Sequence, residues 1–538
     1  MKLISYRRSV LVLGRREVNR RSALRHSSIP KGLCPPAQGC SPSEVLLTKE
    51  GELPWEIRTK HYPTLKGLWH CRILLYVFCL VTLTALGQSP VTITIEPQAT
   101  GPNISSNFVG LSFGMKSMLP NAKGMLFFSP TNQPLIILIQ NLGVTHLRMG
   151  GTSVESPIST PIPGKIELDN LFAFARAAGV KKLIYSLRLL QPRAELDYAS
   201  TNAAIAKYIW DNYRSQLDCF ALGNEPDLQR VYDQDLIITN FSTYISQWRK
   251  FAAAVTKVVP EAKFAGPDAG SGNISWTTHF ATAEKNSDLI SAITEHFYVG
   301  GAGRGVTAPN GIEAILSPER LAANQTLYDS MAAPVFSAGL PLRFTEANDH
   351  YSGGVPGASD TFAGALWALD FLHWWAAHGV SSVDFHNTQW VVNDVITPDS
   401  EGHLTINPKG YGLRAFELGS HGRSARITLS NADNLNLTAY AVNAPKNKLV
   451  TVINKEHGPG ARSAKVSIMV PGFSGQTEVI YLNSPNNNVT AKSGVTLGGG
   501  AIDAGHTWQG QWAVLKKSGP CAVTVPATSA AIVKLSLP

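Results

Sequence analysis

Two glutamates stand directly after apolar runs that are typical of buried strands. Glu225 lies in "FALGNEPD" and Glu346 lies in "RFTEANDHYSGG". Burying an ionised carboxylate is costly unless a partner or a reaction uses it. Two carboxyl groups at one rim suit glycoside hydrolysis, in which one acid protonates the leaving oxygen and the other carboxylate meets the anomeric carbon. Either glutamate alone could simply end its strand in a salt bridge, but their joint occurrence favours catalysis.

Eight short apolar runs alternate with longer amphipathic segments between residues 105 and 421. This alternation predicts an α/β fold in which eight strand–helix units close into a (β/α)8 TIM barrel, with an open doubly wound sheet as the alternative. The runs are 108–115, 144–151, 181–189, 217–227, 263–270, 291–300, 341–349 and 382–390. Glu225 is expected to end the fourth strand and Glu346 the seventh. Both are therefore expected on the working face, where the carboxyl ends of barrel strands meet.

The pattern of apolar and polar residues changes at about residue 422. From there to residue 538 apolar and polar residues alternate with period two between turn clusters such as "SPNNN" and "GGG", which predicts an antiparallel β-sandwich. The early strand-like run "VTITIEP", within residues 88–104, is expected to pair with that sandwich. The catalytic barrel is then predicted over residues 105–421.

The two glutamate contexts resemble glycoside hydrolases with (β/α)8 barrels whose catalytic glutamates end strands four and seven. Within that clan the chain most resembles glycoside hydrolase family 79, the β-glucuronidase and heparanase-like group. Three features carry this resemblance: "LRMGGT" after the second strand, the Tyr-Ser-Gly-Gly loop and apolar helix after Glu346, and the trailing β domain with its borrowed strand. The resemblance spans residues 90–538.

The resemblance implies that Glu225 is the acid/base and Glu346 the nucleophile of a retaining reaction. Asn224 could hydrogen-bond the sugar 2-OH, or could simply form the turn before Pro226. Tyr298 could donate to the nucleophile and hold it ionised, or could merely line the barrel mouth. Arg148 could pair with Glu346 and lower its pKa, or could be a structural charge.

A glucuronidase must also bind the carboxylate of its sugar. The resemblance assigns this to Tyr351, Ser352 and Gly353, where a hydroxyl and backbone N–H groups could form an anion-binding concavity; the alternative is a loop that only turns the chain. The loop after the eighth strand, "HNTQWVVND" (386–394), departs from the glycine-rich loop expected there, which leaves substrate preference open. Trp390 in this loop could stack on a sugar ring or belong to the core.

The net charge of +9 comes from the N-terminal segment alone. Residues 1–87 contain 14 Lys and Arg and five Glu, so the remaining residues are neutral overall and offer no basic surface for nucleic acid. Residues 73–87 form an apolar run of signal-peptide type behind a basic extension, 1–72, that resembles a segment wrongly joined to the gene. Secretion is predicted, with no stable membrane insertion after signal cleavage; a type II membrane anchor is the alternative.

Sequons and cysteines agree with export. Four of the six cysteines precede residue 88, and Cys219 with Cys521 are expected as two buried thiols rather than one bridge. Six Asn-x-Ser/Thr sequons follow residue 88 and are candidate glycosylation sites: Asn103, Asn240, Asn273, Asn324, Asn436 and Asn488.

No metal or cofactor is expected. The histidines at 296, 373, 378 and 386 lack zinc-ligand spacing, and "GGAGRG" (300–305) lacks the third glycine of a dinucleotide motif. The prediction is a secreted retaining exo-β-glucuronidase that removes terminal, optionally 4-O-methylated, glucuronic acid from glycans. The rivals are an arabinofuranosidase, xylosidase or endo-glucuronidase of the same clan, and a catalytically silent carbohydrate-binding protein. The oligomeric state is left open.

Overall fold

The computed structural model describes residues 89–537, apart from 157–159, 191–196, 229–237, 239, 388–389 and 516–520. The basic extension and the apolar run predicted as a signal peptide therefore lie outside the described residues, as do the four cysteines that precede residue 88. None of the helices within the described part of the chain has the length and apolar character needed to cross a membrane.

The predicted barrel is confirmed. Its eight strands are all parallel and close on themselves in chain order, because β2 pairs with both β3 and β9. Each of the eight predicted runs contains or overlaps one strand. The strands are β2 (Val109–Gly114), β3 (His146–Gly150), β4 (Lys182–Leu187), β5 (Leu217–Leu222), β6 (Phe264–Ala269), β7 (Ile290–Tyr298), β8 (Leu342–Asn348) and β9 (Ser382–His386).

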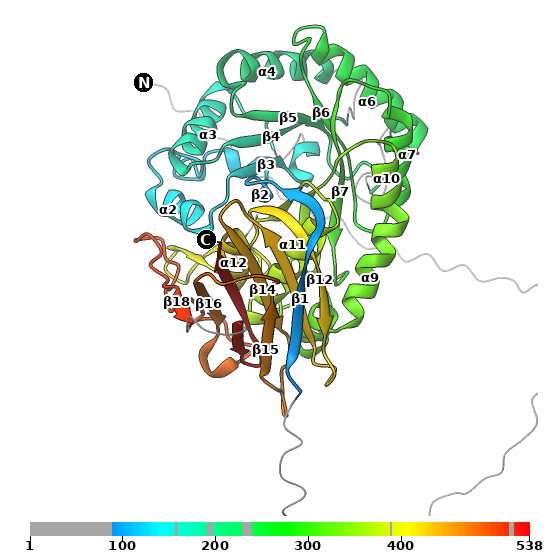
Figure 1. The fold of residues 1–538 in the computed structure, drawn as a ribbon. Coiled ribbons are helices and arrows are strands. Elements are labelled where there is room, and N and C mark those ends of the chain that lie inside the picture. The colour runs from blue at the N-terminus through cyan, green and yellow to red at the C-terminus, as the bar shows by residue number, and fades with distance from the viewer. Residues whose placement is uncertain are drawn as a thin grey trace, which may run out of the picture. The chain divides into compact units, whose positions relative to one another are not determined.

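Helices surround this barrel (Figure 1) and explain why its strands are apolar on both faces: one face meets the barrel interior and the other meets the helices. All six residues of β2 are buried, for example. The helices are α2 (Gln133–Leu142), α3 (Lys165–Ala178), α4 (Tyr198–Tyr213), α6 (Phe241–Thr256), α7 (Ile274–Glu284), α8 (Ala308–Leu316), α9 (Glu319–Leu327), α10 (Ala333–Ser337), α11 (Phe362–Ala377) and α12 (Pro408–Gly419). A two-stranded ribbon, β10 (Ile396–Pro398) and β11 (Leu404–Ile406), precedes α12.

The second domain is one continuous sheet of ten strands. β1 (Val91–Ile104) pairs antiparallel with β12 and parallel with β15, so the N-terminal strand belongs to this sheet, and β1–β15 is the parallel pair among its otherwise antiparallel described strands. The last strand in the order, β19, also contacts β14 and β20, which folds the sheet into two layers around an apolar core. The others are β12 (Gly422–Ser430), β13 (Leu437–Asn443), β14 (Asn447–Asn454), β15 (Ala464–Met469), β16 (Thr477–Asn483), β17 (Thr496–Leu497), β18 (Ala513–Leu515), β19 (Cys521–Val525) and β20 (Ser529–Ser536).

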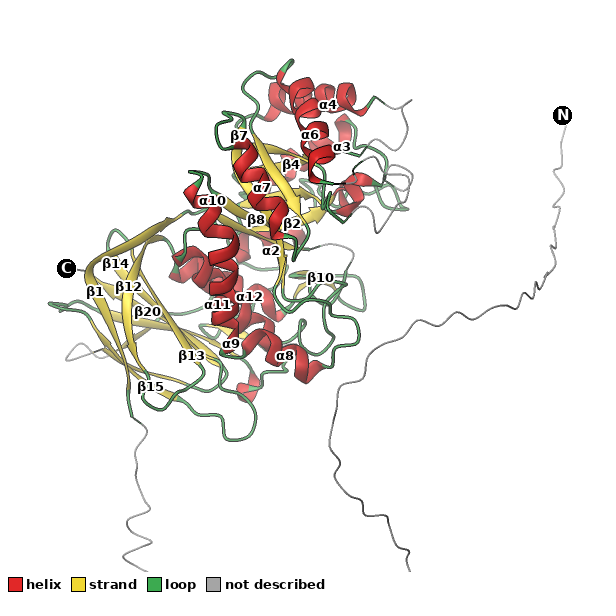
Figure 2. Cartoon of the chain, turned by 90° about the vertical axis from the view of Figure 1, so that its right-hand side faces the viewer, coloured by secondary structure: helices red, strands yellow, loops and turns green. Residues whose placement is uncertain are grey.

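Helices α11 and α12 lie between the barrel and the sandwich (Figure 2), and both contact strands of the sandwich. The side chain of Asp370 on α11 accepts hydrogen bonds from Thr438 at 2.7 Å and Tyr440 at 2.6 Å, and it pairs with Lys455 at 2.6 Å. A buried charge is tolerated where such partners surround it. We call these four residues the seam cluster.

The two described cysteines are free thiols, so no bridge joins Cys219 to Cys521. Cys219 is buried among Ile184, Ala221 and Ala265. Cys521, at the start of β19, is only partly buried, so the expectation of two buried thiols holds for Cys219 alone.

Candidate active site

Glu225 stands in the turn that follows β5. Gly223 adopts a φ of +89°, which favours glycine, and Glu225 itself has a φ of +45°. The Glu225 N–H donates to the carbonyl of Asp268 at the end of β6, at 2.8 Å. The turn is thereby tied to the neighbouring strand, and the Glu225 side chain keeps 14% of its surface exposed.

Glu346 points from β8 into a set of donors. Its Oε1 accepts a hydrogen bond of 2.7 Å from the Tyr298 hydroxyl, and its Oε2 accepts one of 2.9 Å from Arg148. The pairings of Tyr298 and Arg148 with Glu346 that the sequence suggested are therefore present. The nucleophile assigned by the resemblance is held at both oxygens.

Arg148, fully buried on β3, distributes its guanidinium among several acceptors. Nη1 donates to Ser112 and Glu346, and Nη2 donates to Asn224 and Asp268, each at 2.9–3.1 Å. Asn224 is buried, and its Oδ1 is the acceptor for Arg148. One cation thus fixes the orientation of Asn224 and Glu346 together. The contact of Asn224 with a sugar 2-OH stays a prediction.

Two histidines that the sequence analysis set aside belong to this site. Nδ1 of His296 lies 3.0 Å from Glu225 Oε1 and 4.0 Å from Glu346 Oε2, and Nδ1 of His386 lies 3.3 Å from Glu346 Oε2. A signal for His296 was available, because it precedes Tyr298 by two residues on one strand and therefore shares its face. His386 ends β9 in register with Ser112, which only the closed barrel reveals.

Asp268 is a further residue that sequence reasoning missed. It is buried on β6 and accepts hydrogen bonds from Arg148 at 2.9 Å and from Thr345 at 2.6 Å. With Glu346 it provides two negative charges around one guanidinium. No motif marks it in the sequence, since "GPDA" reads as an ordinary strand end.

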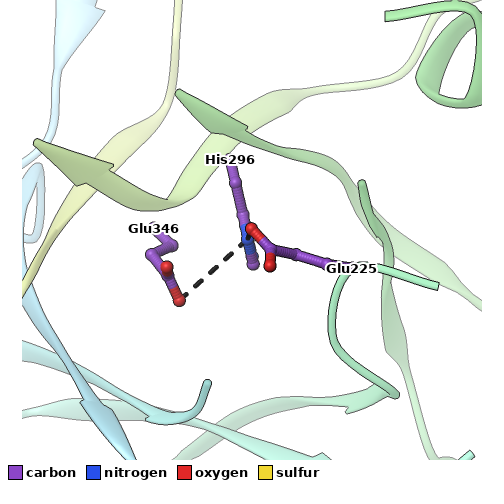
Figure 3. A group of neighbouring side chains, drawn as sticks. All are labelled: Glu225, His296 and Glu346. Atoms are coloured by element: carbon purple, nitrogen blue, oxygen red, sulfur yellow. Dashed lines mark hydrogen bonds and ion pairs between the residues drawn. The ribbon is translucent and has the colours of Figure 1, made fainter. Parts of the chain in front are cut away.

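Figure 3 shows Glu225 and Glu346 facing one another beside His296. One carboxyl oxygen of each glutamate and the imidazole nitrogen lie within 4.8 Å of one another. Carboxyl groups of retaining glycosidases are separated by about 5–5.5 Å, whereas inverting enzymes need about 6.5–9.5 Å to admit a water molecule. The short gap fits the retaining arrangement.

The electrostatics of the site keep Glu346 ionised. Burial alone would raise the pKa of Glu346, but nearby His386, His296 and Arg148 and the hydrogen bond from Tyr298 lower it to about 2. Burial lowers the pKa of His386 itself, which favours its neutral form. Burial lowers the pKa of His296, yet Glu346 and Glu225 outweigh this and raise it above its usual value. Burial raises the pKa of Tyr298 well above its usual range, so its phenol keeps the proton that it donates.

The loop predicted to bind the sugar carboxylate lies next to these residues. The ring of Tyr351 packs edge-on against that of Tyr298 with centroids 6.2 Å apart. Ser352, Gly353 and Gly354 have φ angles of +62°, +89° and +90°, an unusual run for the backbone and a costly one for serine. The loop therefore adjoins Tyr298, and both its contact with a sugar and its role as a carboxylate site stay predictions.

Trp390 is 44% exposed, so of the two readings left open for it the core is wrong. Its ring packs edge-on against Phe127, with centroids 5.4 Å apart. An exposed indole of this kind suits stacking on a sugar ring.

Among the described residues, Glu225, His296 and Glu346 form the group whose ligand atoms could hold a metal ion. A cation there would share Glu346 with the guanidinium of Arg148, only 2.9 Å away. Like charges so close disfavour binding. The geometry therefore favours proton chemistry at this site.

The six sequons differ in exposure. Asn103, Asn240 and Asn488 are exposed. Asn324 on α9 is only 3% exposed, so it is wrong as a glycosylation candidate in the folded chain, because a glycan needs its amide nitrogen at the surface. The Asn436 amide donates to the Leu316 carbonyl and that of Asn273 donates to Asp227, which argues against both.

Known proteins that resemble this chain agree with the fold and the site described above. Residues 419–532 match the family model described as the glycosyl hydrolase family 79 C-terminal beta domain. Two proteins named beta-glucuronidase, from Aspergillus niger and Neurospora crassa, are 28% identical over 186 residues and 30% identical over 188 residues. Residues 419–532 are therefore a domain of the glycosyl hydrolase family 79 C-terminal type, and the two matched beta-glucuronidases agree with that family. Each match covers 32% of this chain and 34% of the relative, about a third of its length.

Solved structures share the fold of this chain. A 4-O-α-L-rhamnosyl-β-D-glucuronidase from Fusarium oxysporum 12S superposes with a TM-score of 0.64 at 17% identity, covering 83% of this chain and 100% of that one. An α-L-arabinofuranosidase from Thermotoga maritima gives 0.57 at 15% identity, with the same coverage. At such identities the likeness establishes the fold alone.

Proposed function

We propose that this chain is a family 79 enzyme, a retaining exo-β-glucuronidase that releases terminal, optionally 4-O-methylated, glucuronic acid from glycans. The observation that carries the proposal is the approach of one Glu225 oxygen to one Glu346 oxygen within 4.8 Å. A gap this short supports double displacement, since the carboxyl groups of an inverting pair stand about 6.5–9.5 Å apart to admit the attacking water. The matches to two beta-glucuronidases support the choice of sugar.

In the first step Glu346 attacks the anomeric carbon while Glu225 gives its proton to the departing oxygen. The glycosidic bond breaks, and an ester between Glu346 and the sugar forms. Glu225, now ionised, then takes a proton from a water molecule, whose oxygen attacks the anomeric carbon and releases Glu346. Arg148, Tyr298 and the two histidines hold Glu346 in the ionised form that the attack requires.

The loop at Tyr351, Ser352 and Gly353 is proposed to receive the sugar carboxylate. It adjoins Tyr298, which touches the nucleophile, and its backbone runs through three successive positive φ angles. Backbone N–H groups exposed by such turns can bind an anion. Trp390 is proposed to stack on the substrate.

The test is hydrolysis of a panel of aryl glycosides. The β-glucuronide should be cleaved with retention of anomeric configuration, followed by NMR, and a 2-fluoro glucuronide should label Glu346. Preferred cleavage of an α-arabinofuranoside or a β-xyloside would assign the chain to a rival activity of its clan, and release of oligosaccharides would show endo action. Turnover of no glycoside would leave a carbohydrate-binding protein.

Glu225→Gln tests the role of the acid separately. Substrates with good leaving groups need no proton, so their hydrolysis should fall much less than that of substrates with poor leaving groups. An equal fall for both classes would remove Glu225 from this role.

Secretion and glycosylation are proposed from the signal-like run at 73–87 and from the exposed sequons Asn103, Asn240 and Asn488. Mass spectrometry of protein from the culture medium should give a mature N-terminus near Gln88. Enzymatic removal of N-glycans should reduce its mass. Retention of residues 73–87 in a membrane fraction would favour the anchor instead.

A further inference from the structure

Lys409 is a buried cation with an unusual position. It is completely buried and stands at the start of α12, where the helix dipole disfavours positive charge. Removing an ammonium group from water costs several kcal/mol unless its partners compensate. A lysine that is both buried and placed at a helix N-terminus is expected to have a structural or functional role.

The partners of Lys409 come from two segments that leave the barrel mouth. Its Nζ pairs with Asp349 Oδ2 at 2.9 Å, donates to the Asn393 carbonyl at 2.8 Å and also donates to Asn348 Oδ1. Asn348 ends β8, three residues before Tyr351. Asn393 belongs to the loop after β9 that contains Trp390.

These partners in turn hold the two loops. Asp349 Oδ1 accepts hydrogen bonds from the His350 N–H at 2.6 Å and from the Ser359 hydroxyl at 2.9 Å, which ties together the two ends of loop 350–359. Asn393 Nδ2 donates to the His350 carbonyl at 2.7 Å. Asn348 Nδ2 donates to the carbonyls of His386 and Asn393, at 3.0 and 2.9 Å, and so holds the described residues at both ends of loop 386–394.

The two loops also pack directly. A Cβ atom built on Gly354 would lie 2.8 Å from Asn393 Cβ, and one built on Gly353 would lie 3.5 Å from Val391. Each loop therefore forms part of the other's support. The hydrogen bond that joins them, from Asn393 Nδ2 to the His350 carbonyl, involves a residue that Lys409 itself contacts.

We propose that Lys409 is a positioning residue that holds loops 350–359 and 386–394 together and so fixes the part of the sugar site that recognises the C5 substituent. The inference rests on the proposed function, because loop 350–359 contains Tyr351, Ser352 and Gly353. Lys409 touches neither catalytic glutamate. Glu346 lies within β8 and Glu225 follows β5, and Arg148 and Tyr298 hold Glu346 from barrel strands that lie outside these loops. His386, which lies 3.3 Å from Glu346, ends β9 at the point where loop 386–394 begins.

The chain supplies a matched control. Lys455 is equally buried, pairs with Asp370 at 2.6 Å, and belongs to the seam cluster between α11 and the sandwich. Lys409→Met and Lys455→Met each leave a buried aspartate without its cation. Both should therefore lower the melting temperature, while only Lys409→Met should alter the sugar site.

The experiment compares aryl β-glucuronide with aryl β-xyloside, which is the same sugar without the C5 carboxylate. Lys409→Met should lower kcat/KM for the glucuronide roughly 30- to 100-fold, mainly through KM, since displaced binding groups cost this much. Cleavage of the xyloside should change about threefold or less, as expected for a surface that it does not contact. Lys455→Met should leave the ratio of the two substrates unchanged, and an equal change in both variants would overturn the proposal.

Amide hydrogen exchange provides a readout that needs no activity. Exchange should rise in residues 350–359 and 386–394 of Lys409→Met and stay unchanged there in Lys455→Met; unchanged loops in Lys409→Met would overturn the proposal. If that variant does not fold, Asn393→Ala, which removes only the bond to His350, carries the same two tests. If the wild type cleaves neither glycoside, the proposed function fails and the exchange result alone decides whether Lys409 holds the loops.

Discussion

The barrel mouth and the seam cluster both bury a carboxylate among donors, yet they differ in what the carboxylate faces. Asp370 is enclosed by Thr438, Tyr440 and Lys455, whose contacts with it measure 2.6–2.7 Å. Glu346 has Tyr298, Arg148 and His386 within 3.3 Å, but it also faces the partly exposed Glu225. A second carboxyl group placed close to the first does not stabilise the folded state.

This difference separates a charge that joins two domains from a charge prepared for a reaction. In the seam cluster the three donors satisfy the carboxylate of Asp370, so removing that carboxylate should change the free energy of unfolding. At the mouth the donors keep Glu346, the proposed nucleophile, ionised next to the proposed acid, so its removal should change the rate of the reaction. Replacing the carboxylate with an amide should therefore lower the catalytic rate at Glu346 and the stability of the fold at Asp370.

Glu346→Gln should have the largest effect in the molecule. Loss of the nucleophile should lower kcat on the order of 10⁵-fold, as removal of other enzymatic nucleophiles does. Arg148 keeps Asp268 as its partner, so the free energy of unfolding should change by only about 1 kcal/mol. Steady-state kinetics and urea unfolding on the same preparation measure both quantities. An active Glu346→Gln variant would contradict the difference proposed between the barrel mouth and the seam cluster.

Asp370→Asn should show the reverse pattern. It leaves Lys455 buried without its counter-charge, which should lower the free energy of unfolding by about 3–5 kcal/mol. The kcat/KM of the folded fraction should stay at the wild-type value, because the seam cluster touches none of the mouth residues. Denaturant titration with parallel kinetics checks this, and a selective loss of kcat would show that the two regions are coupled.

The opposite end of the barrel offers a third buried charge. His146 pairs with Asp384 at 2.6 Å; burial lowers its pKa, but Asp384 and Asp218 raise it to about 9. The folded chain keeps this proton where the unfolded chain has lost it, so the stability is fully present below pH 6.5 and is lost as pH rises through 9. The loss should be about 3 kcal/mol.

Unfolding free energies measured between pH 6 and pH 10 test this expectation. The decline should disappear in His146→Gln. It should remain in His403→Gln, whose side chain is 73% exposed and serves as the control. A wild-type curve that stays flat over this range would show that His146 loses its proton at its ordinary pKa.

Tyr298→Phe should give the smallest effect. It removes one hydrogen bond to a charged oxygen, worth about 1.5–3 kcal/mol, so kcat should fall about 10- to 100-fold with little change in KM. Arg148 still holds the other oxygen of Glu346. A fall as large as that of Glu346→Gln would mean that Tyr298 does more than orient the nucleophile.

Much of the fold could be read from the chain because its signals are local. The eight apolar runs fall where the barrel strands are, and the period-two pattern after residue 422 marks the sandwich. The strand-end positions of Glu225 and Glu346 followed from the same runs. The parallel pairing of β1 with β15 was not predicted, since neither strand carries a signal of its partner.

The sequence by itself determined which carboxylates reach the mouth, because a residue at the end of a barrel strand has its place set by chain order. Only the tertiary structure decided which other groups surround them. His386 and Asp268 lie on strands distant in sequence, and closure of the barrel brings them to this site. The partners of a buried charge are its neighbours in space, so no local sequence pattern could have predicted these residues.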